Sequence, residues 1–135
     1  MKGFDPKAYA EKHPELAARA GIGAEGRRSK YGSTKTLYNG VLYDSKLEST
    51  CAAQLDALIR SGYVLSWQGQ VWFQVGPAIR YVADFYVLYA QGEPRTIDAK
   101  GAETDVFKLK RKLFEFHHGP LDLVKRWQEI PLEGR

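Results

Sequence analysis

The sequence predicts an α/β fold in which a central mixed β-sheet is flanked by helices. From about residue 36, after a small hairpin, the expected elements follow the order helix, strand, strand, strand, helix, strand. Such a mixture is typical of a sheet covered by helices. The chain has 135 residues, 44% of them hydrophobic, which suits one core and one domain. No apolar run approaches the roughly 18 residues that a membrane span needs.

Residues 1–35 differ in character from the remainder. They are rich in lysine and arginine and hold few large apolar side chains, too few for a core of their own. A short helix is expected over Lys7–Ala20, and the glycines of Gly21–Gly26 are typical of a flexible connection. We therefore interpret residues 1–35 as a basic N-terminal arm and residues 36–135 as the folded domain.

The first predicted elements are a tight hairpin and a helix. Asn39-Gly40 lies at the centre of Leu37–Tyr43, and this dipeptide favours a type I′ turn. A helix is expected over Ser45–Arg60, with Gly62 placed where a helix stops. Its apolar face recurs at helical spacing and consists of Leu47, Cys51, Leu55 and Leu58.

The central strands are predicted from aromatic and β-branched runs. They are Val71–Val75, Ile79–Tyr89 and Arg95–Lys100, and a turn at Gln91–Pro94 separates the last two. We interpret the tryptophans, Trp67, Trp72 and Trp127, as packing residues.

A second helix over Thr104–His117 is expected to end at Gly119-Pro120, and a final strand to cover Leu121–Val124. The apolar stripe of the helix is predicted to be Val106, Leu109, Leu113 and Phe116.

Strand alternation brings candidate catalytic residues together. Asp98 and Lys100 are separated by one residue, so they project from the same face of their strand. A loop of three residues (90–92) or five residues (89–93) places Asp84 opposite Asp98, with Cβ atoms roughly 5 Å apart. An even number of loop residues would put the carboxylates on different faces.

Opposed carboxylates repel each other unless a positive group lies between them. Mg²⁺ prefers carboxylate oxygen and often takes few protein ligands beside water and substrate phosphate. We therefore expect Asp84 and Asp98 to bind Mg²⁺, with Mn²⁺ as a substitute, and the Ala99 backbone carbonyl to serve as a further ligand. Lys100 would position the attacking water or stabilise negative charge in the transition state.

These residues carry a resemblance to a known superfamily. Glu48 on a helix, Ala83-Asp84, and Asp98-Ala99-Lys100 resemble the PD-(D/E)XK nuclease signature. Residues 36–118 are similar to a small phage-associated family of this superfamily and, more loosely, to archaeal-type Holliday junction resolvases. The shared segments are Tyr43–Glu48, Tyr81–Phe85, Asp98–Gly101 and Phe107–Phe114. The resemblance implies a restriction-endonuclease-like core (αβββαβ) with Glu48, Asp84, Asp98 and Lys100 as catalytic residues.

The resemblance has departures and leaves alternatives open. Alanine replaces the proline before Asp84, and Asp98 stands where resolvases usually carry glutamate. Ser45 and Glu48 also fit a capping box at a helix start, so Glu48 is either a cap, a metal ligand (direct or through water), or both. Gln70 and Gln74 would each form a hydrogen bond with a phosphate or water near the metal. For Gln74 the alternative is an ordinary strand residue without such a role.

The formal net charge of +4 favours a polyanionic partner. Basic residues form candidate DNA contacts, with a solvated surface as the alternative. These residues are Arg27, Arg28, Lys30, Lys35, Lys108, Lys110, Arg111 and Lys112.

The predicted function is a metal-dependent DNA endonuclease, preferably a Holliday junction resolvase that makes paired nicks in four-way junctions as a homodimer. The alternatives are a nuclease of the same fold acting on flaps, ends or a restriction site, a non-catalytic DNA-binding module, and a protein-interaction domain. Met1–Ala10 lacks a secretory apolar segment, and the single Cys51 excludes an internal disulfide. We expect a cytoplasmic protein without membrane contact, located in the host cytoplasm if phage-encoded.

Overall fold

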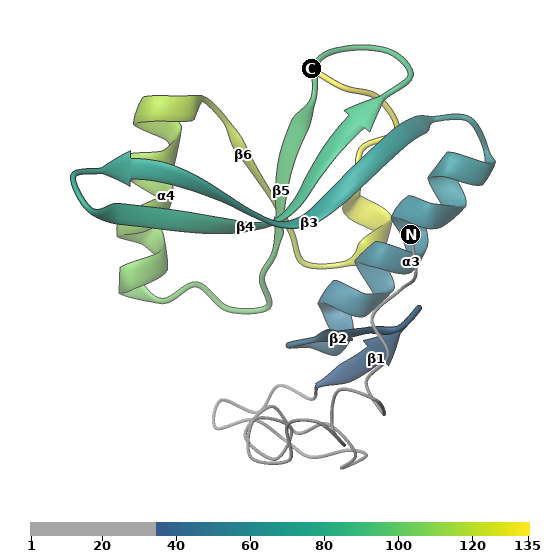
Figure 1. Ribbon diagram of the computed structural model, residues 1–135, viewed down its shortest axis with the longest axis horizontal. Helices are drawn as coiled ribbons and strands as arrows, with labels where there is room; N and C mark the ends of the chain where they lie inside the picture. Colours follow the sequence, from purple (N-terminus) through teal and green to yellow (C-terminus); the bar gives the residue numbers. More distant parts are fainter. Residues whose placement is uncertain (1–34) are drawn as a thin grey trace. The chain divides into compact units, whose positions relative to one another are not determined.

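The computed structural model describes residues 35–135 (Figure 1), and the predicted arm helix and linker lie outside this range. The chain divides into two compact units, the first ending at Ala53 and the second beginning at Gln54. The elements are β1 (Thr36–Tyr38), β2 (Val41–Tyr43), α3 (Lys46–Arg60), β3 (Val64–Gly76), β4 (Ile79–Tyr89), β5 (Arg95–Ala99), α4 (Asp105–His118), β6 (Leu121–Val124) and the 3-10 helix η1 (Trp127–Glu129). Over residues 35–135 the predicted element order is confirmed.

The first unit contains the predicted hairpin and the start of α3. Strands β1 and β2 pair antiparallel, and the turn residues Asn39 and Gly40 have φ values of 48° and 80°. Positive φ at both turn positions is what a type I′ turn requires. Helix α3 begins where Ser45 Oγ accepts a hydrogen bond from the Glu48 backbone N–H at 3.1 Å. Cys51 is fully buried, as predicted.

The second unit is built on a four-stranded mixed sheet. Its order is β3-β4-β5-β6, with antiparallel pairing from β3 through β5 and parallel pairing between β5 and β6. Alternate residues of β4 are buried, because one side of this strand faces the core. These residues are Tyr81, Ala83, Phe85, Val87 and Tyr89.

Strand β3 is longer than the sequence suggested. It starts at Val64 rather than Val71 and pairs with β4 along most of its length. Its first half is anchored by Trp67, whose Nε1 donates to Asp56 Oδ1 at 2.8 Å and whose ring meets Phe85 edge-on at 5.5 Å. The glycine and glutamines of residues 68–70 concealed this half, because they lack the β-branched character that signals a strand.

Helix α4 packs beside β3 and β6, but on a different face from the predicted one. The buried residues are Phe107 and Phe114, whereas Val106, Leu109 and Phe116 are 65%, 60% and 84% exposed. The predicted stripe was therefore wrong, except for the half-buried Leu113.

The physical reason is aromatic packing. Phe114 meets Phe73 edge-on at 5.0 Å and Tyr81 at 5.4 Å, and Tyr81 also contacts Phe107. Two rings, Phe107 and Phe114, meet these aromatic partners on the sheet, whereas the predicted stripe offers one ring, Phe116. The face with two large aromatic side chains therefore turns inward. The N-terminus of α4 is capped by Thr104, whose Oγ1 accepts from the Phe107 N–H at 3.1 Å.

The C-terminal tail pairs with the loop between β4 and β5. Backbone hydrogen bonds join Gly134 N–H to Gln91 O at 2.8 Å, Glu93 N–H to Arg135 O at 2.7 Å, and Arg135 N–H to Glu93 O at 3.1 Å. Arg95 reinforces this contact by donating to Glu133 O and pairing with Asp122. The tail therefore acts as an additional short extended segment against this loop.

The packing role predicted for the tryptophans is confirmed only for Trp67. Trp72 is 60% exposed and lies under the guanidinium of Arg80, 5.3 Å from its ring centroid. Trp127 is 41% exposed. Among residues 35–135, no helix is long and apolar enough to cross a membrane.

Candidate active site

Asp84 and Asp98 occupy opposite positions on β4 and β5. The strands pair Phe85 with Ile97, Tyr86 with Thr96 and Val87 with Arg95, and this register extended by one step sets Asp84 against Asp98. Residues 88–94 lie between the ladder pair Val87 and Arg95, an odd count as predicted. The predicted register is confirmed as far as Phe85 and Ile97, one step before the aspartates.

The two carboxylates replace the ordinary ladder bonds between the strands. The backbone N–H of Asp84 donates to Asp98 Oδ1 at 2.8 Å, and the backbone N–H of Ala99 donates to Asp84 Oδ2 at 2.9 Å. Each aspartate thus accepts a hydrogen bond from the backbone of the other strand. This exchange fixes both side chains between β4 and β5.

Tyr81 holds Asp98 from a third side, a contact that the sequence analysis missed. Its hydroxyl donates to Asp98 Oδ2, and both residues are almost completely buried. Burial raises the pKa of Tyr81 far above its usual range, and the nearby Asp98 carboxylate raises it further. The available signal was a tyrosine on the buried side of a strand, since a buried tyrosine hydroxyl usually finds a hydrogen-bond partner.

Burial also changes the ionisation of the acidic pair. It raises the pKa of Asp84 to about 7, assisted by the negative charge of Asp98. Burial likewise raises the pKa of Asp98, against the hydrogen bonds from Tyr81 and Asp84 and the charge of Lys100. Near neutral pH the pair therefore does not carry two full negative charges by itself.

Lys100 supplies the positive charge at the site. Its side-chain charge lowers the pKa of both carboxyls, so it lies within electrostatic range of each. Its Nζ lies 5.0 Å from the centroid of the Phe107 ring, a distance typical of a cation–π contact. Its backbone N–H donates to Val124 O at 3.0 Å, which ties the residue after β5 to β6.

Gln70 lies on β3, opposite Asp84 of β4. The ladder pairs Gly69 with Phe85 and Val71 with Ala83 but leaves Gln70 and Asp84 unpaired. Gln70 has a φ of 53°, and hydrogen bonding from its side chain lowers the pKa of Asp84. Gln74 makes other contacts: its side-chain Nε2 lies 3.5 Å from Gly76 O, and its backbone carbonyl oxygen lies 2.7 Å from His118 Nε2.

The other predicted site residues are distributed over the chain. Glu48 lies in the first turn of α3, in the first compact unit, and its role at a metal stays a prediction. Its backbone confirms the Ser45 half of the predicted cap. Lys35 forms an ion pair with Asp44 at 2.8 Å. Arg27, Arg28 and Lys30 lie outside the described residues.

The predicted basic residues of α4 fall into different groups. Lys108, Lys110 and Lys112 are exposed, with no ion pair to other residues of the described range. Arg111 is half-buried and lies near Glu103 and Glu115 at 3.9 and 3.4 Å. Arg111 also donates to Leu121 O at 3.3 Å, so it links α4 to β6.

The acidic pair has a donor set suited to a hard divalent cation. Carboxylate oxygens and a backbone carbonyl are the ligands that Mg²⁺ and Ca²⁺ prefer. Within the described part of the chain, no three His, Cys, Asp or Glu side chains gather in a way that could hold a metal ion. A Mg²⁺ site with two carboxylates, completed by water and substrate phosphate, requires no third side chain.

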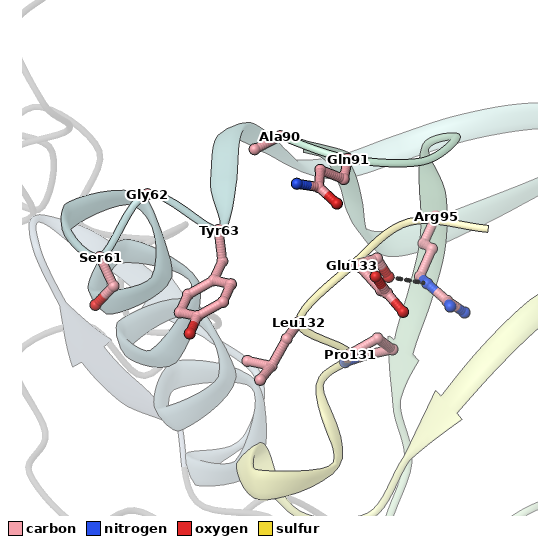
Figure 2. A pocket seen from close by; sticks show the side chains of 9 residues that line it. All are labelled: Ser61, Gly62, Tyr63, Ala90, Gln91, Arg95, Pro131, Leu132 and Glu133. Atoms are coloured by element: carbon pink, nitrogen blue, oxygen red, sulfur yellow. Dashed lines mark hydrogen bonds between the residues drawn. The ribbon is translucent and has the colours of Figure 1, made fainter.

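A separate surface hollow of about 680 Å³ lies at the C-terminal end of β4. Figure 2 shows it between the residues that follow α3, the β4–β5 loop and the C-terminal tail. Tyr63 lies on one side of it and Glu133 and Arg95 on the other, and the Arg95 side chain donates to the backbone carbonyl of Glu133. None of the acidic-pair residues lines this hollow.

The fold and site define an α/β protein in which a mixed sheet presents a buried pair of aspartates beside a lysine. A family model described as "Protein of unknown function (DUF1064)" matches residues 28–130. This match covers well over half of the chain, and the chain belongs to the DUF1064 family. No curated protein and no solved structure matches the chain.

Proposed function

We propose that this protein is a metal-dependent DNA endonuclease with a restriction-endonuclease-like core. The observation that carries the proposal is the placement of Asp84 opposite Asp98, each bonded to the backbone of the other strand, with Lys100 directly after the strand. A purely structural role would not require opposed acids, because a buried like-charge pair is destabilising without a compensating cation. The arrangement therefore favours a site built for a cation.

Asp84 and Asp98 would hold the cation, with the Ala99 carbonyl as a further ligand and Glu48 as a direct or water-mediated one. Mg²⁺ would be the physiological ion and Mn²⁺ a substitute. A cation bound there would polarise the scissile phosphate and lower the pKa of a nearby water.

The protein side chains would then have distinct roles. Asp98 is fixed by Tyr81 and the Asp84 N–H, so it would act as the rigid ligand. Asp84 is less buried and would face the incoming substrate. Lys100, held beside Phe107, would orient the attacking water or stabilise negative charge on the phosphate. The expected products carry a 5′-phosphate and a 3′-hydroxyl.

DNA would contact the exposed lysines of α4, because phosphate contacts give affinity without sequence readout. Lys108, Lys110 and Lys112 suit this role better than Arg111, which is engaged with acidic neighbours. Lys35 and the basic residues of the arm, Arg27, Arg28 and Lys30, would add to the same electrostatic attraction.

The preferred substrate is a four-way junction, cut by paired nicks from a homodimer with two active sites. We place the protein in the cytoplasm.

The test is cleavage of a labelled four-way junction in Mg²⁺, beside flap and linear duplex controls, by the wild type and by Asp84→Asn. Paired symmetric nicks that are lost in Asp84→Asn are expected. Cleavage of flap or duplex alone would keep the nuclease but replace its substrate. DNA binding without metal-dependent cleavage would favour a non-catalytic module, and no DNA affinity at low salt would favour a protein-interaction domain.

A further inference from the structure

The backbone of β3 is distorted at the position that faces Asp84. Between Ser66 and Gln74, each residue of β3 has a ladder partner on β4 except Gln70. The residue opposite Gln70 in this register is Asp84, whose N–H is directed to β5 instead. Two register shifts lie near the ends of β3, at Val64/Ser66 and Gln74/Gly76, whereas the break at Gln70 lies in its middle, at the position of the candidate site.

Gln70 adopts a conformation that its side chain does not favour. Its φ of 53° lies in the left-handed region, which costs energy for residues other than Gly, Asn and Asp. Non-glycine residues held in this region cluster at functional sites, where surrounding structure imposes them. The backbone here is not short of space. A Cβ on the neighbouring Gly69 would lie 3.5 Å from Asp84 O, which is an ordinary contact distance.

Register places Gln70 beside the acid. Gln70 of β3 and Asp84 of β4 are opposed positions without a ladder pair, and hydrogen bonding from the Gln70 side chain lowers the pKa of Asp84. Asp84 Oδ2 accepts from the Ala99 N–H on β5, so an amide on β3 would restrain this carboxylate from the strand on the other side of β4.

We propose that Gln70 is a positioning residue that orients the Asp84 carboxylate for a divalent cation. This inference deepens the proposed function and rests on it for the identity of the ligand. It predicts that β3 maintains a strained residue for function and not for stability. Groups that orient metal ligands typically affect metal affinity or activity by about 10–100-fold when removed.

The decisive variant is Gln70→Gly, which keeps the left-handed backbone and removes the amide. Its thermal midpoint is expected to stay the same or rise, because glycine accepts positive φ without strain. Mn²⁺ affinity, measured by titration calorimetry, is expected to fall by about 10–100-fold. Gln70→Asn, which retains an amide and tolerates positive φ, should recover part of the loss.

The matched control is Ala78→Gly in the β3–β4 turn, where φ is 58°. It relieves the same kind of strain away from the acids and should leave Mn²⁺ affinity unchanged. Equal affinities for wild type and Gln70→Gly would overturn the proposal, as would a large loss of stability in Gln70→Gly.

A measurement without metal or DNA separates this proposal from the nuclease assignment. Hydrogen exchange of the Ala99 amide reports the Asp84 bond directly. Exchange should accelerate in Gln70→Gly while the Ile97 amide is unaffected, even if wild type cleaves no DNA. If wild type binds Mn²⁺ without cleavage, the nuclease assignment fails and the positioning role stands. An unchanged Ala99 amide would show that Gln70 does not position Asp84.

Discussion

The backbone N–H of Asp84 donates to the carboxylate of Asp98 at 2.8 Å, so these acids are neighbours through a hydrogen bond and not only through a shared face. Asp84 in turn accepts from Ala99, the residue after Asp98, at 2.9 Å. In both hydrogen bonds a backbone N–H donates to a carboxylate, and such bonds favour the ionised form of the acid. Burial acts in the opposite direction, and the balance determines how the pair titrates.

The acidic pair should make the metal-free protein less stable as pH rises. The pKa of Asp84 is raised from 3.8 to about 7 in the folded state, whereas an unfolded aspartate titrates near 3.9. Between these values the folded chain holds a proton that the unfolded chain has released, so the free energy of unfolding falls as pH rises through this window. In EDTA, the thermal midpoint should decrease from pH 5 to pH 8.

Asp84→Asn is the control for this titration, because it removes the ionising group and retains the shape. The pH dependence of its midpoint should be flatter than that of the wild type. Mg²⁺ should raise the wild-type midpoint more at pH 8 than at pH 5.5, since it binds the ionised pair. A midpoint that increases from pH 5 to pH 8 in EDTA would contradict the assigned direction of the shift.

The position of the acids could be predicted because it depends on strand alternation and loop parity. An odd connection fixes the face of Asp84 relative to Asp98, whatever the exact loop. Tyr81 and the restraint by Gln70 could not be derived in this way. They depend on which side chain meets Tyr81 in the folded sheet and on a backbone break at Gln70, and loop parity contains no information on either feature.

The face of α4 was mispredicted because the helix carries apolar residues on two sides. Val106, Leu109 and Phe116 have helical spacing, and so do Phe107 and Phe114. Only the tertiary partners, Phe73 and Tyr81, decide between these faces. A pattern along one helix cannot supply that choice, since tertiary packing contributes most of the stability of a helix.

Truncation should destabilise the protein strongly on the buried side of α4 and hardly at all on the exposed side. Phe114→Ala removes a fully buried ring and should cost about 3–5 kcal/mol of unfolding free energy. Phe116→Ser changes a side chain that is 84% exposed and should alter stability by less than about 0.5 kcal/mol. Urea denaturation of both variants checks the assignment. Comparable losses would show that Phe116 is buried in solution.

The C-terminal tail should be sensitive to a single methyl group. A Cβ on Gly134 would lie 2.1 Å from Glu93 O, so Gly134→Ala would separate the tail from the β4–β5 loop. We expect faster hydrogen exchange of the Glu93 amide, which donates to Arg135 O, and a loss of about 1–3 kcal/mol. Gly101→Ala is the matched control, because its Cβ would meet open space. Equal exchange in both variants would refute a packed tail.

Lys100 should separate cation binding from chemistry. It shares the site with the carboxylates and lowers the pKa of both, so it competes electrostatically with a bound cation. At pH 8, where Asp84 is ionised, Lys100→Gln should bind Mn²⁺ at least as tightly as the wild type. Its cleavage rate should nevertheless fall by roughly 10²–10³-fold, the range for losing one group that stabilises developing charge. Lys100→Arg, which keeps the charge but not the shape, should retain part of the rate.

A group that acts only on the reacting phosphate leaves the metal-bound ground state intact. If Lys100→Gln lost Mn²⁺ affinity in parallel with cleavage, Lys100 would therefore be a structural support of the acidic pair.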